Sequence, residues 1–456
     1  MKKYKELKKT GSATREDVKK QQEIHDEINQ MLELVKKKYD YYLASLYAGG
    51  IQDEMKFADV LRSKDINDFK TEEMEPLWKI AEEKKFFHWE LEFPEVFLKG
   101  GFDVVIGNPP YVDVQDTEFR YSVYYTLSSR NLYAYMMENS IEKSKNGGVY
   151  GFIIPLSLVT SPKMISIKNY VIKRSRNIWI NSYSIRPAKI FQNVDQRVCI
   201  IYGSKDILSE CVNIYTTKYI MWNSNQRKQL FNNVEYASLT YPHNMSNFDI
   251  YKVGTDIELS ILKKLNMKEH RIGDYLLNND GEISEDELEN HIFYHSAVRY
   301  WIKALNFIPE FINEGVERQS SKYKPIHFAK KINKNIPLAL LNTSLFFWYW
   351  IITSDCRDLM FESIQNFRIN MDEFDDKTIA TLEILCENLM RSYIDNSEIK
   401  TCNMATIGQV SYREFHPKYS KEIIDKIDDV FAKHYGFTQE ECEFIKSYEI
   451  KFRMGE

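Results

Sequence analysis

The sequence predicts an α/β fold with a parallel sheet in its middle part. Four short apolar segments are candidate strands, at residues 103–106, 149–154, 178–184 and 198–203. Helical patterns lie between them, and such alternation is typical of βαβ units. The first segment leads into Asn108-Pro109-Pro110-Tyr111. This tetrapeptide would lie at the carboxyl end of a strand, where open α/β sheets place their functional sites.

Hydrophobic patterning divides the chain into four regions. Residues 1–100 are highly charged and helical, with a long helix from Arg15 to about Leu46, a stop at Gly49-Gly50 and a second helix near 72–85. Residues 101–205 carry the strand–helix alternation, and residues 206–400 become a mixture of short aromatic-rich segments. Residues 401–456 are expected to be helical, because Thr438 and Glu441 form a capping-box pattern after Gly436.

The tetrapeptide suits the alkylation of an exocyclic amine on a flat base. Such a nitrogen is a poor nucleophile because its lone pair is delocalised into the ring. The Asn108 side-chain oxygen and the Pro109 carbonyl would face its hydrogens and localise that lone pair, while Pro109 and Pro110 fix φ and remove competing N–H donors. Tyr111 offers a flat face on which a flipped-out base can stack. The alternative is a Pro-Pro turn after a strand, followed by a core tyrosine.

These residues resemble motif IV of the adenine-N6 DNA methyltransferases, which reads Asn or Asp, Pro, Pro, and Tyr or Phe. Other segments are similar to the same family in the family's order, from about Phe86 to the C-terminus, and match the large type IIG and BREX-like restriction–modification kind. They are a motif V helix at 130–138, the next strand at 147–155, a motif VIII region at 185–191 and 195–201, and a tail at 434–437 and 451–455.

The resemblance implies a partial Rossmann-like methyltransferase sheet, with only its later strands present. Residues 101–205 would be the C-terminal half of the catalytic domain, and residues 206–400 a mixed α+β target-recognition domain. It also implies direct methyl transfer from S-adenosyl-L-methionine to a flipped adenine, with Asn108, Pro109, Pro110 and Tyr111 as the catalytic residues. Phe191, at the motif VIII position, would stack on the second face of the base, although ordinary core packing is an equal alternative for it.

The cofactor loop of this family has no counterpart in the first hundred residues. These enzymes bind S-adenosylmethionine through a glycine-rich loop that precedes motif IV, so Asn108 is the one cofactor contact expected here. We therefore expect a C-terminal part of such an enzyme, either half of a split protein or a truncated product, with a partner polypeptide that carries the glycine-rich motif. The strand at 103–106 would then have an open edge and bare apolar faces.

Local charge indicates nucleic acid, although the net charge of −5 does not. Residues 162–194 and 318–354 contain no acidic residue but many basic ones. Most charge runs are solvated faces, but two of them after a base-flipping motif favour phosphate contact with double-stranded DNA. The candidate DNA-binding residues are Lys163, Lys173, Arg174, Arg176, Arg186, Arg197, Arg299, Arg318, Lys322 and Lys324.

No metal site or membrane span is expected. The six cysteines show no paired spacing with one another or with histidine. The most apolar stretch, residues 336–352, is too short and too interrupted by polar residues to span a bilayer, so it should be buried core. The N-terminus lacks the apolar core of a signal peptide, and the expected location is the cytoplasm.

The expected function is site-specific adenine-N6 methylation of DNA in a restriction–modification or phage-defence system. Two other classes stay open. One is a non-catalytic DNA-binding specificity subunit, since the chain lacks a recognisable cofactor loop. The other is an enzyme that methylates a protein glutamine or ribosomal RNA, although about 250 residues follow the methyltransferase part here, where such enzymes usually end soon after it.

Overall fold

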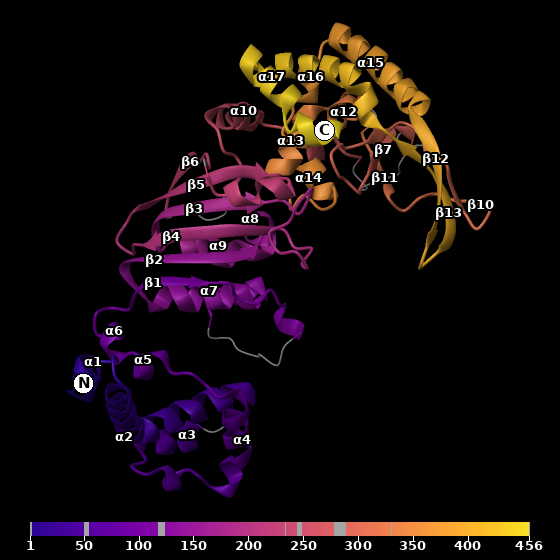
Figure 1. Ribbon diagram of the computed structural model, residues 1–456. Helices are drawn as coiled ribbons and strands as arrows, with labels where there is room; N and C mark the ends of the chain where they lie inside the picture. The colour runs from indigo at the N-terminus through magenta and orange to yellow at the C-terminus, as the bar shows by residue number, and fades with distance from the viewer. Residues whose placement is uncertain are drawn as a thin grey trace.

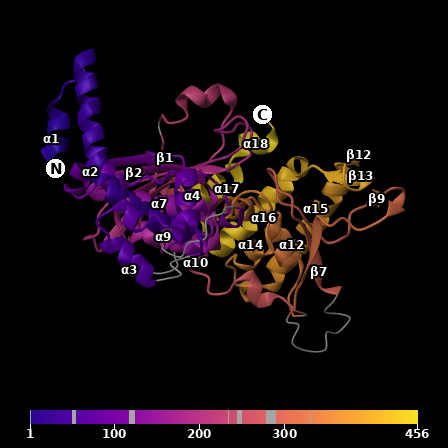
Figure 2. The same cartoon turned by 90° about the horizontal axis from the view of Figure 1, so that it is seen from below.

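The chain forms three consecutive bodies: N-terminal helices, a central sheet and a C-terminal body (Figure 1). The computed structural model describes residues 2–49, 54–116, 124–232, 234–243, 249–277, 289–329 and 331–455. The N-terminal helices and the β12–β13 hairpin lie at opposite ends of the molecule (Figure 2).

The N-terminal region is helical, as predicted. Its helices are α1 (Lys2–Lys9), α2 (Arg15–Tyr47), α3 (Glu54–Arg62), α4 (Glu75–Lys84), α5 (Trp89–Glu92) and α6 (Pro94–Phe97). The long helix α2 begins at Thr14, whose side chain forms a capping box with Asp17. A small core of Tyr41, Phe69 and Trp78 holds this region together, separate from the main core.

The central sheet has six strands in the order β1-β2-β4-β3-β5-β6. The strands are β1 (Phe102–Gly107), β2 (Ser144–Pro155), β3 (Ser175–Tyr183), β4 (Val198–Lys205), β5 (Cys211–Ile220) and β6 (Ala237–Pro242), with helices α7 (Leu132–Lys143), α8 (Ser157–Thr160) and α9 (Ile165–Ile172) between them. All four predicted strands are therefore confirmed.

Two features of this sheet differ from the predictions. The sheet is mixed, because β4 runs antiparallel to β2 and β3, and only the pairs β1–β2 and β3–β5 are parallel. The boundary expected at residue 205 is not a break in the fold, because β5 and β6 continue the same sheet. Strands β5 and β6 both lie within residues 206–400, where the sequence does not show strand–helix alternation.

One face of the sheet is buried and the other is partly open. Successive residues of a strand point to opposite faces. Tyr150 and Ile178 point into the main core, which α7 and α9 complete with residues such as Tyr133 and Ile167. On the opposite face, Val104 of the edge strand β1 is exposed.

The C-terminal body packs helices against two small sheets. The helices are α10 (Asp256–Asn266), α12 (Asn335–Leu341), α13 (Ser344–Thr353), α14 (Phe361–Gln365), α15 (Asp376–Asp395), α16 (Lys421–Tyr435), α17 (Gln439–Ser447) and α18 (Ile450–Met454). The sheets have the orders β11-β7-β8 and β10-β9-β13-β12. Their strands are β7 (His291–His295), β8 (Ala304–Leu305), β9 (Phe311–Asn313), β10 (Val316–Glu317), β11 (Tyr323–His327), β12 (Ser397–Met404) and β13 (Gly408–Phe415).

Helices α12 and α13 form the centre of this body, which confirms the prediction of a buried apolar segment. Among the described helices none is alone long and apolar enough to cross a membrane, and α12 with α13 reaches that length only as a pair bent by 63°. Residues 401–456 are not all helical as expected, because much of the β12–β13 hairpin lies there. The capping box of Thr438 and Glu441 does start α17, after the left-handed Gly436.

Candidate active site and nucleic-acid interface

The predicted catalytic residues follow β1 at its carboxyl end. Gly107 still pairs with Phe152 of β2, and the chain then leaves the sheet with Asn108 exposed and Pro109 buried. The Tyr111 hydroxyl lies 2.7 Å from the Asn108 Oδ1 atom and 2.9 Å from the Ile153 carbonyl oxygen. It has one proton, so it donates to one of these acceptors at a time.

Burial raises the pKa of Tyr111 to about 12, so the hydroxyl keeps its proton and stays a donor at neutral pH. The hydrogen bond from Tyr111 thereby orients the amide of the exposed Asn108. A carbonyl oxygen has two lone pairs, so Oδ1 can still accept a second hydrogen bond from outside. The site offers an oriented acceptor next to an aromatic ring.

Tyr111 and Phe191 pack against the same small hydrophobic cluster. Its buried members include Tyr183, Ala188 and Trp222. The structure thus brings the two predicted stacking residues to one place, although they are far apart in the sequence. Phe191 is half-buried against this cluster, so its ring has a packing role in addition to any contact with a base.

The loops after β2 and β3 leave the sheet at the end where β1 also finishes and where Asn108 lies. Pro155, the last residue of β2, pairs with Val198, and Val198 also pairs with Tyr183, the last residue of β3. The segments after Pro155 and Tyr183 therefore leave the sheet at the end where Asn108 lies, with β2 next to β1 and β3 two strands further on. They form one side of a large groove, and the C-terminal body forms the other.

This groove has a volume of about 1870 Å³ and an excess of positive charge. Its lining includes twelve lysine or arginine residues but only five acidic ones, although the whole chain has a net charge of −5. Such a local excess is the electrostatic signature of a nucleic-acid surface. The basic residues are Arg186, Lys189, Arg197, Arg227, Arg299, Lys303, Arg318, Lys322, Arg357, Arg413, Lys418 and Arg453.

Half of the predicted DNA-binding residues line the groove. They are Arg186, Arg197, Arg299, Arg318 and Lys322. Arg197 also has a local role, because its Nη2 atom donates to the Cys356 carbonyl oxygen at 2.7 Å. Seven basic residues of the groove are not among the predicted ones, and most of them lie outside the two acid-free stretches of the sequence: Lys189, Arg227, Lys303, Arg357, Arg413, Lys418 and Arg453.

The structure does not bring the other five predicted residues, Lys163, Lys173, Arg174, Arg176 and Lys324, into the groove. Ser175 starts β3 and pairs with Lys205, so its neighbours Arg174 and Arg176 lie at the end of the sheet away from Asn108. Arg174 is engaged with Glu142 at 3.0 Å and lies over the Tyr170 ring. Arg174 and Arg176 therefore lie far from the groove, and DNA contact by these five residues stays a prediction.

The edge strand β1 is open, as expected from the sequence. β1 is the terminal strand of the sheet and pairs only with β2 among the described residues. Val104 is 59% exposed and Ile106 is 79% exposed, on the face that α7 and α9 do not cover. An apolar edge strand without a cover is what soluble proteins normally avoid.

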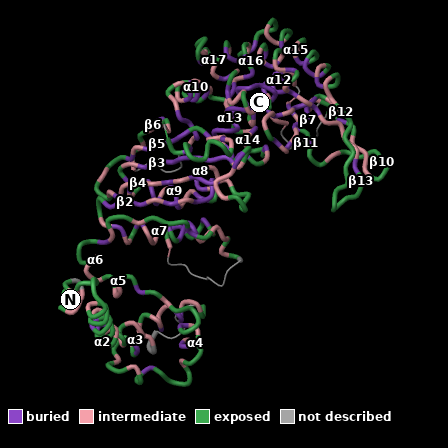
Figure 3. Tube along the Cα trace, viewed as in Figure 1, coloured by how far each residue is buried: buried purple, intermediate pink, exposed green. Residues whose placement is uncertain are grey.

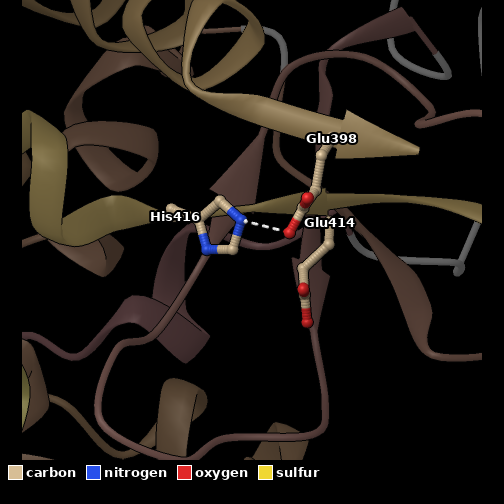
Figure 4. A group of neighbouring side chains, drawn as sticks. All are labelled: Glu398, Glu414 and His416. Carbon is tan, nitrogen blue, oxygen red and sulfur yellow. Dashed lines mark hydrogen bonds and ion pairs between the residues drawn. The ribbon is translucent and has the colours of Figure 1, made fainter. Parts of the chain in front are cut away.

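One side-chain cluster has the composition of a metal site but not its charge balance. Glu398, Glu414 and His416 place their ligand atoms within 4.8 Å of one another. Figure 4 shows the three side chains together at the β12–β13 hairpin. The Lys400 ammonium forms ion pairs with both carboxylates, and the His416 Nε2 atom lies 3.1 Å from Glu398. Because a lysine already supplies the positive charge, we assign no metal here.

Comparisons with known proteins agree with the site. Residues 27–191 match the sequence profile of the family described as Eco57I restriction-modification methylase. The match covers most of the N-terminal helices as well as β1, the tetrapeptide and Phe191. A protein of Methanocaldococcus jannaschii, whose description names a type II restriction enzyme and methyltransferase, is 25% identical over 177 residues, which is 38% of this chain but 14% of that protein.

Solved structures of restriction–modification enzymes are similar in part. The type IIL enzyme MmeI in complex with DNA has a TM-score of 0.38 and 12% identity, over 83% of this chain and 63% of that one. The type IIG endonuclease BpuSI has a TM-score of 0.28 and 12% identity, over 77% and 53%. The resemblance to the methyltransferases of large type II restriction–modification enzymes is confirmed, and residues 27–191 are the part of the chain that is similar to the Eco57I restriction-modification methylases.

Proposed function

We propose that this chain takes part in the methylation of adenine N6 in double-stranded DNA, with S-adenosyl-L-methionine as the methyl donor, within a restriction–modification or phage-defence system. The observation that carries the proposal is the position of Asn108 and Tyr111, at the same sheet edge as a groove rich in lysine and arginine. The match of this segment to a restriction-modification methylase supports it.

In this proposal the chain's own residues orient and polarise the target amine. The Asn108 Oδ1 atom and the Pro109 carbonyl oxygen accept hydrogen bonds from the two N–H groups of the amine, which localises the nitrogen lone pair. The donor supplies a methyl group on a positively charged sulfur, which is already an activated leaving group. The nitrogen forms one bond to carbon as the sulfur–carbon bond breaks, and the nitrogen then releases one proton to solvent. Positioning and electrostatic complementarity provide the acceleration.

Tyr111 and Phe191 would hold the extruded base between their rings. Both pack on the cluster around Tyr183 and Trp222, which limits the movement of the two rings, and Tyr111 is also hydrogen-bonded to Asn108. The groove would hold the duplex through its phosphates, with Arg186 and Arg197 in the segment between β3 and β4 that leaves the sheet at the end where Asn108 lies.

Cofactor binding would need a further polypeptide segment. Among the described residues Asn108 is the one group that we place toward the methyl donor, and the residues described before β1 form helices rather than a strand with a glycine-rich turn. The open β1 edge, with Val104 and Ile106 bare, is where a strand carrying that loop would pair. Calorimetric titration of the purified chain with S-adenosylmethionine should give weak or no binding; tight stoichiometric binding would contradict this part of the proposal.

A DNA-binding specificity subunit without catalysis is the second candidate. The groove favours it, because the chain gathers twelve basic residues on one surface. Methylation of a protein glutamine or of ribosomal RNA fits less well, because a large body follows the sheet and forms half of the groove.

The first test is DNA affinity as a function of salt. Arg299→Ala with Lys322→Ala removes two groove charges that are exposed in the structure. If both contact phosphates, the slope of log affinity against log salt should fall by nearly two, because each contact contributes about 0.9. The matched control, Lys173→Ala with Arg176→Ala, removes the same charge from the remote end of the sheet and should leave the slope unchanged. Equal effects of the two pairs would contradict the assignment of the groove.

A further inference from the structure

The second of the two candidate stacking residues, Phe191, lies in an irregular loop. The loop spans residues 184–197 between β3 and β4, and none of its residues belongs to a helix or a strand. Figure 3 shows β3 and β4 as largely buried or half-buried and the connections at the ends of the sheet as more exposed. The hydrogen bonds of a regular element therefore do not fix the Phe191 ring, and its position depends on contacts with other parts of the chain.

Arg227 holds this loop at the peptide group that leads into Phe191. Its guanidinium donates two hydrogen bonds to consecutive backbone carbonyls. The Nη2 atom lies 2.8 Å from the Lys189 oxygen, and the Nη1 atom lies 3.2 Å from the Ile190 oxygen. The Ile190 carbonyl and the Phe191 nitrogen belong to one planar peptide group. A fixed carbonyl therefore restricts the direction in which the chain enters Phe191 and the direction in which its side chain leaves.

The same guanidinium contacts the hydrophobic cluster of the site. The Arg227 Cζ atom lies 4.9 Å from the centroid of the Trp222 ring. Trp222 is buried in the cluster against which Tyr111 and Phe191 both pack. The Trp222 carbonyl oxygen also accepts a hydrogen bond from the Ala188 N–H at 3.1 Å. Arg227 and Trp222 together connect the loop of Phe191 to the cluster that supports Tyr111.

The local structure around Arg227 favours these contacts. Arg227 lies in a short 3₁₀ helix, Ser224–Gln229, which begins at Asn223 with a capping box. The Asn223 N–H donates to the Gln226 Oε1 atom at 2.8 Å. Leu230, directly after the helix, is buried in the same hydrophobic cluster. Because both ends of the helix are held, the backbone of Arg227 has little freedom to move.

These contacts depend on the shape of the guanidinium and not only on its charge. A planar guanidinium presents its donors as a fixed fork and lies flat over an aromatic ring, whereas a lysine ammonium is a compact point charge. A DNA phosphate, in contrast, attracts either cation. The next residue, Lys228, is exposed on the same helix, while the two loop carbonyls are bonded to Arg227. Lys228 is therefore a matched control for charge.

We propose that Arg227 is a positioning residue for base stacking. It fixes the Ile190–Phe191 peptide group against the Trp222 cluster, so that the Phe191 ring meets the extruded adenine opposite Tyr111. Arg227 acts through Phe191 and contacts neither the base nor the methyl donor. The inference rests on the proposed methylation of DNA, and it gives one basic residue of the groove a role other than phosphate binding.

The first test is the single-turnover rate of methyl transfer at saturating duplex DNA, with this chain and the proposed polypeptide that carries the glycine-rich loop. Arg227→Lys keeps the charge but loses the fork. The rate should fall about tenfold, the factor that corresponds to one net hydrogen bond to a charged group. DNA affinity and its salt dependence should stay as in wild type, because the positive charge remains. The control, Lys228→Met, should keep the wild-type rate at saturating DNA.

A double-mutant cycle tests whether Arg227 acts through Phe191. In a Phe191→Ala background, Arg227→Lys should cause no further loss of rate, because the ring that it positions is absent. A full tenfold loss in that background would overturn the inference.

Amide hydrogen exchange of the purified chain gives a readout that does not depend on activity. The segment 187–194 should exchange about tenfold faster in Arg227→Lys than in wild type or Lys228→Met. Exchange in β3 and β4 should be unchanged, which would show that the variant is folded.

The outcomes separate this inference from the proposed function. If wild type transfers methyl groups and Arg227→Lys does so at the same rate, the inference is wrong and the proposed function stands. A loss of DNA affinity in Arg227→Met that Arg227→Lys fully restores, together with the wild-type rate, would make Arg227 a phosphate contact instead. Absence of methyl transfer by the wild-type complex would contradict the proposed function itself. Equal amide exchange in all variants would overturn the inference independently of activity.

Discussion

The open edge of the sheet gives a prediction whose size follows from the structure. Fully burying a Val or Ile side chain contributes about 1.5–3 kcal/mol. Scaled by the exposed fractions, 59% for Val104 and 79% for Ile106, covering both side chains would release about 2–4 kcal/mol. That range corresponds to a factor of about 30 to 1,000 in an association constant. Ile106→Lys should remove much of it and place a charge on the edge.

Sedimentation velocity over a range of concentrations is the assay. Wild type should self-associate or co-purify with a protein that covers β1, while Ile106→Lys should sediment as a monomer. The stability of the chain itself should change by less than about 0.5 kcal/mol, because an exposed side chain has few contacts to lose. Met267→Lys is the matched control, since Met267 is 74% exposed and lies at the end of α10 in the C-terminal body.

Two results would refute this reasoning. A loss of more than about 2 kcal/mol of stability in Ile106→Lys would show that the side chain is buried within the chain. Equal association of wild type, Ile106→Lys and Met267→Lys would show that the exposed side chains of β1 do not contribute to association.

Three other predictions follow from particular side chains. Asn108→Ala should lower methyl transfer about 100- to 1,000-fold with DNA affinity unchanged, in single-turnover and binding assays. Tyr111→Phe keeps the ring but loses the donor to Asn108 and Ile153, so stability should fall by about 1 kcal/mol and turnover by less than tenfold. Burial lowers the pKa of His434 from 6.5 to about 4. The unfolded chain therefore binds a proton at this site before the folded one does, and native stability should fall as the pH drops from 6.5 to about 4. His434→Gln should remove up to about 3 kcal/mol of that dependence in urea unfolding.

Strands with a clear apolar pattern were predictable, but their neighbours in the sheet were not. Residues 103–106, 149–154, 178–184 and 198–203 all became strands because each is a compact apolar run. The antiparallel β4 could not be foreseen, because strand direction depends on the path of the loop at 184–197 and not on the strand's own residues. The β12–β13 hairpin escaped detection because most of its residues are polar or charged and exposed on both faces.

The candidate site was predictable to the extent that its residues form a motif. Asn108 and Tyr111 are close in sequence, and the motif that contains them directly follows an apolar run, which predicts their place at a strand end. The groove instead gathers residues from widely separated parts of the chain, and a charge run is a poor guide to such a surface. Arg176 belongs to a basic run but lies at the remote end of the sheet, while the isolated Arg357 lines the groove.

The most direct test of the proposed chemistry is the identity of the methylated nucleoside. Duplex DNA would be incubated with labelled S-adenosylmethionine, this chain and the proposed polypeptide that carries the glycine-rich loop, then digested and analysed by mass spectrometry. We predict label in N6-methyladenine, lost with Asn108→Ala. Label in another nucleoside, in protein or in RNA, or unchanged methylation with Asn108→Ala, would contradict the account.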